Sequence, residues 1–495
     1  MKSSTQLSLV AAAVSAVLGT AAHALPPSNF TDGTIAPANF YYSGGGSAEP
    51  QAVFAAVNAL LQAGTVDVYT DSAASAAHPQ SANFLVISGK TSATNALTGA
   101  GTTFPANTNV AFFYRYSGGS FPNGAQVFVT GGTLAYPTPA SLAGGTLISG
   151  GGHTSLNPTY RYVGVNTDNH APDFGITDEE PALFNFWWNL NGLTQPQSLA
   201  GLNHKPLWVA PFGIAVTDKL YQKKKNWSRG EVAGVLTGGV SDWSQLNDDT
   251  GTPLPAGATI IIDRGSGSGT KASGNEFFLN YPGGQSSLGG SLQPHSVISN
   301  TNVNGGTTGT ALNTSLATLQ DIKEPSGVAE ADDLINANQA GLFALAVEGL
   351  EFPPTSEQHT LGTNDYEFVA IDGAFVDSNT GTVDNINSPN QASSTQYSNI
   401  TNGRYPYAYQ PTYNYKGSLP VSGSFEFDIL GNLTNENLAA AHTGNAFPAS
   451  AQGILLDPIT TGNTDAGNMN WSHNGNSNQP PLFNAVVTPA KPDPL

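Results

Sequence analysis

Hydrophobic positions along the chain fall into short apolar runs and stretches with helical spacing, separated by glycine-rich segments. Residues 50–64 (PQAVFAAVNALLQAG) have helical spacing and end at a glycine, which predicts a helix. Apolar runs at 110–114 and 126–130 predict short strands, and residues 131–152 predict an inserted loop. Residues 206–217 (PLWVAPFGIAVT) contain a proline and a glycine, which predicts a strand that bends or crosses between two lobes.

Local end signals support helices between these strands. Ser228 followed by Glu231 fits a capping box that opens a helix through about Leu236. Strands that alternate with helices predict an α/β architecture with helices packed on sheets. Trp187 and Trp188 are expected in a core, residues 223–225 in an exposed loop, and no internal repeat is evident.

The N-terminus has the pattern of an export signal. Lys2 precedes an apolar run at 7–18, and Ala22-His23-Ala24 is a small-x-small cleavage site, so cleavage is expected before Leu25. The run is shorter than the roughly 20 residues that a membrane-spanning helix needs. Without any cysteine there is no disulfide and no thiol for a lipid anchor. We therefore expect a periplasmic or secreted protein without membrane insertion.

Composition narrows the function further. The 495 residues allow two or three domains, and a net charge of −19 argues against nucleic acid or an anionic membrane as partner. The nine histidines never stand at metal-ligand spacing, so neither a metal nor another cofactor is expected. No G-x-S-x-G stretch offers a serine nucleophile in strand-to-helix context, so we expect no catalytic residues and no enzyme.

Residues 260–281 (IIIDRGSGSGTKASGNEFFLNY) place a glycine-serine loop between an apolar strand and an amphipathic segment. Such a loop offers an anion bare backbone N–H groups and the positive end of a helix dipole. Arg264 adds a forked charge that suits two oxygens of a tetrahedral oxyanion. The residues alone leave an anion pocket, a structural turn and a nucleotide loop open. The P-loop spacing fails because Thr270 stands between Gly269 and Lys271, and the dinucleotide fingerprint lacks its third glycine.

IIIDRGSGSGT resembles the R-x-D-G-S-G-T motif of the phosphate-binding proteins that feed ABC uptake systems, within the type II periplasmic-binding fold. Further segments resemble that family in the order it requires: SGGGSAEP (43–50), APDFGITDEEP (171–181), PFGIAVTDKL (211–220), GEVAGVLTGGVSDWSQL (230–246), AGLFALAVEG (340–349) and NGRYPYAYQPTYNY (402–415). Each segment is short, and the ordered set makes the match specific. The resemblance implies a two-lobed α/β fold, with mixed sheets flanked by helices and a hinge of two crossover strands.

The resemblance also implies an anion site assembled from both lobes. Its phosphate-binding residues would be Ser47, Ala48 (through its amide), Ser120, Asp178, Arg264, Ser268, Gly269 and Thr270. Ser117 is an alternative to Ser120. Asp178 would accept a hydrogen bond from a protonated phosphate, whereas a fully ionised sulfate has no proton to donate and would leave the carboxylate buried and repelled.

The chain departs from the family pattern in two places. Ser266 replaces the family's aspartate two residues after the arginine, so Arg264 loses its customary partner, and Asp263 would project from the opposite side of the strand. Ala48 stands where the family tends to have an aromatic residue, which leaves the amide unaffected. Taken without the resemblance, Asp178-Glu179-Glu180 is more typical of a solvated helix start.

The sequence thus predicts a monomeric binding protein that captures inorganic phosphate and passes it to the membrane component of an ABC transporter. The expected layout is a signal peptide (1–24), a first lobe (25–205), a second lobe (206–350) and a return to the first lobe with a C-terminal extension (351–495). The alternative is a secreted or surface-associated structural protein or adhesin that keeps the fold without phosphate uptake. Extra loops, the asparagine- and glycine-rich tail and the low lysine content favour that alternative.

Overall fold

The computed structural model describes parts of both predicted lobes. These are residues 25–71, 83–147, 159–164, 166–179, 199–207, 210–265, 267–279, 319–324, 326–349, 365–375 and 411–435, with positions 181, 184, 292, 294, 295, 312, 405, 407–409 and 438. The predictions for the signal peptide, Trp187, Trp188, Ser266 and the C-terminal extension lie outside the described residues. In the described part of the chain, no helix has both the length and the apolar character to span a membrane.

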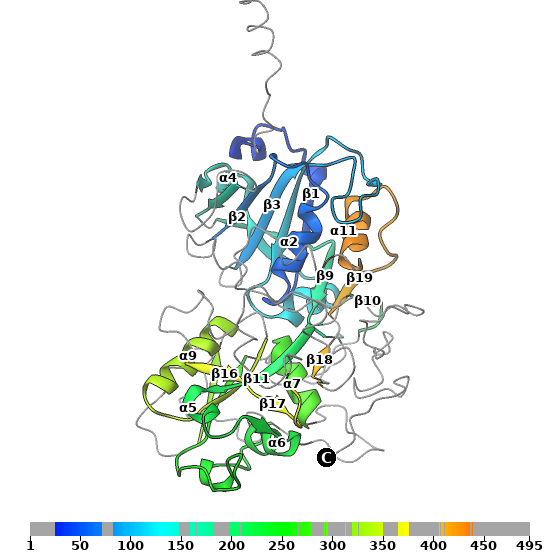
Figure 1. The fold of residues 1–495 in the computed structure, drawn as a ribbon. Coiled ribbons are helices and arrows are strands. Elements are labelled where there is room, and N and C mark those ends of the chain that lie inside the picture. Colours follow the sequence, from blue (N-terminus) through cyan, green and yellow to red (C-terminus); the bar gives the residue numbers. More distant parts are fainter. Residues whose placement is uncertain are drawn as a thin grey trace, which may run out of the picture.

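The first lobe is built on a nine-stranded mixed sheet (Figure 1) with the order β10-β19-β9-β1-β4-β3-β2-β7-β6. Its strands are β1 (Phe40–Gly44), β2 (Asp67–Thr70), β3 (Phe84–Lys90), β4 (Asn109–Arg115), β6 (Thr146–Leu147), β7 (Thr159–Tyr162), β9 (Phe174–Thr177), β10 (Leu202–Pro206) and β19 (Thr412–Lys416). In the middle of the sheet, β1 runs parallel to both β4 and β9. The carboxyl ends of these three strands therefore meet at one edge.

Helices α2 (Pro50–Asn58) and α11 (Phe425–Leu433) contact each other and share one core with this sheet. Val53, Phe54 and Val57 of α2 are fully buried, as the predicted helical spacing requires. On α11, Asp428 accepts hydrogen bonds from Thr103 and Phe104 and ties the returning chain to the first lobe. Smaller elements complete the lobe: η1 (Pro27–Phe30), η2 (Pro37–Asn39), η5 (Pro122–Gln126), α3 (Val127–Thr130), β5 (Leu134–Pro137), α4 (Pro139–Ala143) and β8 (Thr167–His170).

The second lobe has its own mixed sheet with the order β14-β13-β15-β11-β16, and β18 also pairs with β11. The strands are β11 (Ala210–Thr217), β13 (Ile260–Arg264), β14 (Gln320–Glu324), β15 (Leu345–Gly349), β16 (Tyr366–Phe368) and β18 (Ala408–Tyr409). Around them lie α5 (Asp218–Tyr221), α6 (Arg229–Leu236), η7 (Trp243–Gln245), α7 (Gly269–Leu279) and α9 (Gly327–Gln339), and the short strands β12 (Asn226–Trp227) and β17 (Ala370–Ile371). The chain is therefore a mixed α/β protein of two lobes, as the sequence predicts.

Two connections between the lobes can be followed in the described residues. β10 lies in the first sheet and ends at Pro206, and β11 lies in the second sheet and begins at Ala210, so the chain passes from one sheet to the other between two strands rather than along one. It returns between β18, which pairs with β11, and β19, which pairs with β9 and β10. β16 still pairs with β11 in the second sheet. The second sheet thus extends beyond the boundary expected at residue 350.

The structure corrects two predictions in the first lobe. Residues 126–130 are helical and form the end of η5 and all of α3 rather than a strand. Pro122 starts this helical segment, and Gly131 ends it with a φ of 67°. A five-residue apolar run cannot distinguish strand from helix by periodicity, and these end signals decide the outcome. The expected loop after residue 130 instead contains β5, α4 and β6.

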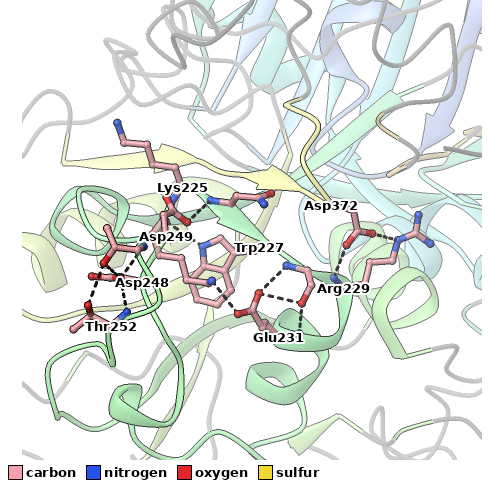
Figure 2. Close-up of polar contacts among 12 residues, drawn as sticks. Lys225, Trp227, Arg229, Glu231, Asp248, Asp249, Thr252 and Asp372 are labelled. Atoms are coloured by element: carbon pink, nitrogen blue, oxygen red, sulfur yellow. Dashed lines mark hydrogen bonds and ion pairs between the residues drawn. The ribbon is translucent and has the colours of Figure 1, made fainter. Parts of the chain in front are cut away.

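The start of α6 is fixed by a polar network beside Trp227, which Figure 2 shows. Ser228 and Glu231 form the predicted capping box. Lys223 and Lys225 are exposed, as the sequence predicts, whereas Lys224 is buried and pairs with Glu231 at 2.9 Å. The Arg229 Nε lies 3.0 Å from Asp372 Oδ2, and the guanidinium lies 4.3 Å from the centre of the Phe277 ring on α7. The network therefore braces α7, the helix that begins at the predicted anion loop.

Candidate functional site

Three loops follow the carboxyl ends of β1, β4 and β9 and lie together at one edge of the first sheet, because these strands are adjacent and parallel. The loop after β1 leads into α2, the loop after β4 leads into η5, and β9 is followed by Asp178. β13 in the second lobe is parallel to its neighbours β14 and β15, and its loop leads into α7. In open α/β sheets, ligands bind outside the carboxyl ends of the strands.

Asn123 holds the first two loops together. Its Nδ2 donates hydrogen bonds to the carbonyl oxygens of Gly45 at 3.1 Å and Ser117 at 3.0 Å. The Gly45 amide in turn donates to the Arg115 carbonyl at 2.9 Å. Asn123 is buried, and sequence reasoning missed it because only the folded chain brings its amide between the two loops.

Asp178 is buried beside Ser120. Asp178 is only 5% exposed, so the interpretation of residues 178–180 as a solvated helix start is wrong for this side chain. The Asp178 amide donates a hydrogen bond to Ser120 Oγ at 2.8 Å, which makes Ser120, rather than Ser117, the hydroxyl that contacts Asp178. Among the described residues, Asp178 Oδ1 has no hydrogen-bond partner. A buried polar group of this kind costs about 1–3 kcal/mol unless a ligand or water satisfies it.

The loop after β13 forms the start of α7. Ser268 Oγ accepts a hydrogen bond from the Lys271 amide at 3.4 Å, and the Thr270 carbonyl accepts one from Ser273 Oγ at 2.8 Å. Ser273 Oγ also lies 3.0 Å from the hydroxyl of Tyr407, next to the returning strand β18. The first turn of α7 is therefore held from the hinge side, and its amino end carries the positive end of the helix dipole.

The two lobes touch at this point. The Phe121 amide donates a hydrogen bond to the Gly267 carbonyl at 3.1 Å. A Cβ added at Gly269 would lie inside 3.0 Å of the Asp178 carboxyl, closer than Cβ atoms are found in proteins. Glycine at 269 thus allows a carboxylate of the first lobe to pack against the first turn of a second-lobe helix.

Ser47 and Ala48 lie half-buried in the loop after β1. The preceding Gly46 faces Asp178, because a Cβ added at Gly46 would lie 2.8 Å from Asp178 Oδ1. Thr270 is buried in the first turn of α7. The structure thus places Asp178 in contact with Ser120 and against Gly269, with Ser47, Ala48 and Ser268 in the adjacent loops and Thr270 in the first turn of α7.

Arg264 makes its described contact inside the second lobe. Its Nε lies 3.8 Å from Glu330 Oε2 on α9, and both side chains are buried. Glu330 is thus an acidic neighbour of Arg264 at a distance longer than a hydrogen bond, and sequence reasoning missed it because it lies on another helix. Burial, and next the charge of Glu348, raise the pKa of Glu330 well above its usual range, although Arg264 opposes the shift.

Asp263 points to the opposite face of β13, as strand alternation predicts. It pairs with Lys271 of α7 and with Lys323 of β14, the latter at 2.8 Å. Burial alone would raise the pKa of Asp263, but the two lysines together lower it to about 2. Asp263 and Lys271 are thus bound to each other and brace α7 against the sheet.

The described residues contain no group of three histidine or acidic side chains that could hold a metal ion. For an anion, this arrangement provides hydroxyl groups, backbone amides at a helix start and one carboxylate that can accept a hydrogen bond. Such groups bind and orient an oxyanion that carries a proton.

Comparisons with known proteins give only distant likenesses. No family model matches this chain, and no curated protein matches it. A putative phosphate ABC transporter substrate-binding protein from Clostridium perfringens is similar over 85% of this chain and 99% of its own, with 11% identity and a TM-score of 0.39. A phosphate binding protein from Stenotrophomonas maltophilia is similar over 84% and 99%, with 14% identity and a TM-score of 0.33.

Proposed function

We propose that this chain is an exported solute-binding protein that captures inorganic phosphate, or a similar tetrahedral oxyanion, between its two lobes. The proposal depends on one observation above all. A buried carboxylate, Asp178, lies beside a buried hydroxyl, Ser120, and against the first turn of α7 from the other lobe. The resemblance seen in the sequence motifs suggests delivery to the membrane component of an ABC transporter.

The chemistry of these groups favours a protonated oxyanion. Backbone amides and hydroxyls stabilise the negative oxygens of the ligand, and the dipole of α7 adds to this attraction. Asp178 can then accept a hydrogen bond from a ligand P–O–H group. Sulfate, which is fully ionised at neutral pH, has no such proton and would face a buried carboxylate.

The two connections between the lobes provide a hinge. Tyr405 on the returning segment donates a hydrogen bond to the Phe212 carbonyl of β11 at 2.6 Å, so the two connections also contact each other. A ligand held by both lobes stabilises the closed arrangement, because only that arrangement offers it contacts with both.

Isothermal titration of the protein without its N-terminal 24 residues tests the proposal, with phosphate and sulfate as ligands. We expect one phosphate per chain, without added metal, and weak or no sulfate binding. In Asp178→Asn, the amide can donate to sulfate, so discrimination between the two anions should fall. Equal loss of affinity for both anions in this variant would contradict the role given to Asp178, and absence of binding to either by the unchanged protein would refute the proposal.

The second candidate is a secreted or surface-associated structural protein that keeps this fold without transport. The extra elements inserted before Asp173, β5, α4 and β6, favour it, as does the low lysine content of the chain. Small-angle X-ray scattering with and without phosphate distinguishes the two. A transport protein should open without ligand and close with it, whereas a structural protein should keep one shape.

A further inference from the structure

Glu49 is a second buried acid next to the proposed anion site. It precedes Pro50, the first residue of α2, and is only 1% exposed. The Tyr114 hydroxyl on β4 donates a hydrogen bond to Glu49 Oε2 at 3.1 Å. Nothing in the sequence motifs pointed to this residue, since a glutamate before a helix is usually a solvated charge.

The carboxyl groups of Glu49 and Asp178 both lie close to the same side of Gly46. A Cβ added at Gly46 would lie 2.8 and 3.0 Å from the two carboxyl oxygens of Asp178 and 3.0 Å from Glu49 Oε2. The two carboxyls therefore lie next to each other on that side of the loop. A carboxyl in this pair can donate a hydrogen bond only if it carries a proton, because an ionised carboxylate can only accept. Two charged carboxylates buried this close would also repel each other strongly.

Each acid keeps one oxygen without a hydrogen-bond partner in the described part of the chain. These are Glu49 Oε1 and Asp178 Oδ1, both on residues more than nine-tenths buried. Two basic side chains of the adjoining second-lobe loop and helix are engaged elsewhere, Arg264 with Glu330 and Lys271 with Asp263. The unsatisfied oxygens therefore point to a ligand that brings its own proton and its own acceptor.

We infer that Glu49 is a specificity-determining residue: the Glu49–Asp178 pair holds one proton and presents one donor and one acceptor to a protonated tetrahedral oxyanion. This inference depends on the proposed function. The ligand's O–H donates to the ionised carboxylate, and the protonated carboxyl donates to an ionised oxygen of the ligand. Phosphate and arsenate monoanions or dianions have both kinds of oxygen, and sulfate has only the acceptor.

The groups that face Glu49 give the direction of the pH dependence. They are Asp178, which follows β9, and Tyr114 on β4. Burial first, and Asp178 next, raise the pKa of Glu49 well above its usual range. Burial, followed by the charges of Glu49 and Asp178, also raises the pKa of Tyr114, so its hydroxyl stays a donor. As pH rises the pair loses its shared proton, and two negative carboxylates then repel the anion.

Phosphate titrations of the unchanged protein and Glu49→Gln, from about pH 5 to about pH 10, test the inference. Glutamine keeps a donor toward Asp178 at every pH and has no proton to lose. The titration of phosphate itself affects both proteins equally, so it drops out of the ratio of their two Kd values. As pH rises, we expect the phosphate affinity of the unchanged protein to fall relative to that of the variant. The fall should reach up to about tenfold per pH unit once the proton of the pair is lost. A ratio that stays constant over this range, with both proteins binding, overturns the inference.

Tyr114→Phe supplies a readout that a purely structural role would not move. The hydrogen bond from Tyr114 lowers the pKa of Glu49, so its removal should shift the alkaline loss of affinity to higher pH. Infrared spectroscopy without ligand should show a protonated carboxyl band at neutral pH that Glu49→Gln reduces. Absence of that band overturns the shared proton, whereas a band without phosphate binding by any variant refutes the proposed function instead.

Discussion

Gly269→Ala tests the contact between the lobes with a single added methyl group. In the structure that methyl would lie inside 3.0 Å of Asp178 Oδ2, Cβ and Cγ, so the lobes cannot keep their present approach. If the lobes move apart by even part of the distance needed to relieve this clash, the hydrogen bond from the Phe121 amide to the Gly267 carbonyl is strained as well. That bond is 3.1 Å long. The substitution should therefore disfavour closure without touching the core of either lobe.

The expected loss follows from the cost of overpacking. Forcing one extra methyl into a packed contact costs about 1–3 kcal/mol, which corresponds to roughly 5- to 150-fold weaker phosphate binding if closure bears the whole cost. Isothermal titration gives the affinity, and thermal unfolding without ligand checks that each lobe is intact.

Gly431→Ala is the matched control. It adds the same methyl to the exposed side of α11, where nothing lies within 4 Å of the new atom. It should leave the affinity unchanged and raise stability by roughly 0.4–1 kcal/mol. Phosphate binding by Gly269→Ala as tight as that of Gly431→Ala would refute the idea that the lobes close through this contact.

Two further predictions concern stability and are measured by urea unfolding. The pKa of Asp263 is about 2 in the folded chain against an ordinary value of 3.8, so its contribution is present above about pH 4 and is lost as pH falls through 2. Asp263→Asn should thus lower the free energy of unfolding by on the order of 2 kcal/mol at pH 7 and by progressively less toward pH 2. A difference between variant and unchanged protein that does not depend on pH would contradict the pairing of Asp263 with Lys271 and Lys323. Asp428→Ala should lower the free energy of unfolding by about 2–4 kcal/mol, because Thr103 and Phe104 lose their hydrogen-bond acceptor. Asp428→Asn keeps one oxygen and should lower it by less. Equal losses in the two variants would argue against these hydrogen bonds.

Features set by neighbouring residues could be predicted from the sequence. The capping box of Ser228 and Glu231 is local, and the spacing of apolar residues in 50–58 fixes the buried face of α2. At residues 126–130 the apolar run was too short to separate strand from helix.

The candidate site was predictable only in part. Its loops follow from the motif resemblance, and the structure places Asp178 beside Ser120 and Gly269 from two of these loops. Glu49 and Glu330 could not be found in this way. Their proximity to Asp178 and Arg264 arises from packing between distant segments, and no local pattern marks it.

The most direct test of the central claim is a crystal structure of the mature chain grown with phosphate. The account predicts one anion between the lobes, with Asp178 and Ser120 on one side of it and the first amides of α7 on the other. An unoccupied junction with Asp178 still packed on Gly269 at saturating phosphate, or an anion bound elsewhere, would contradict it.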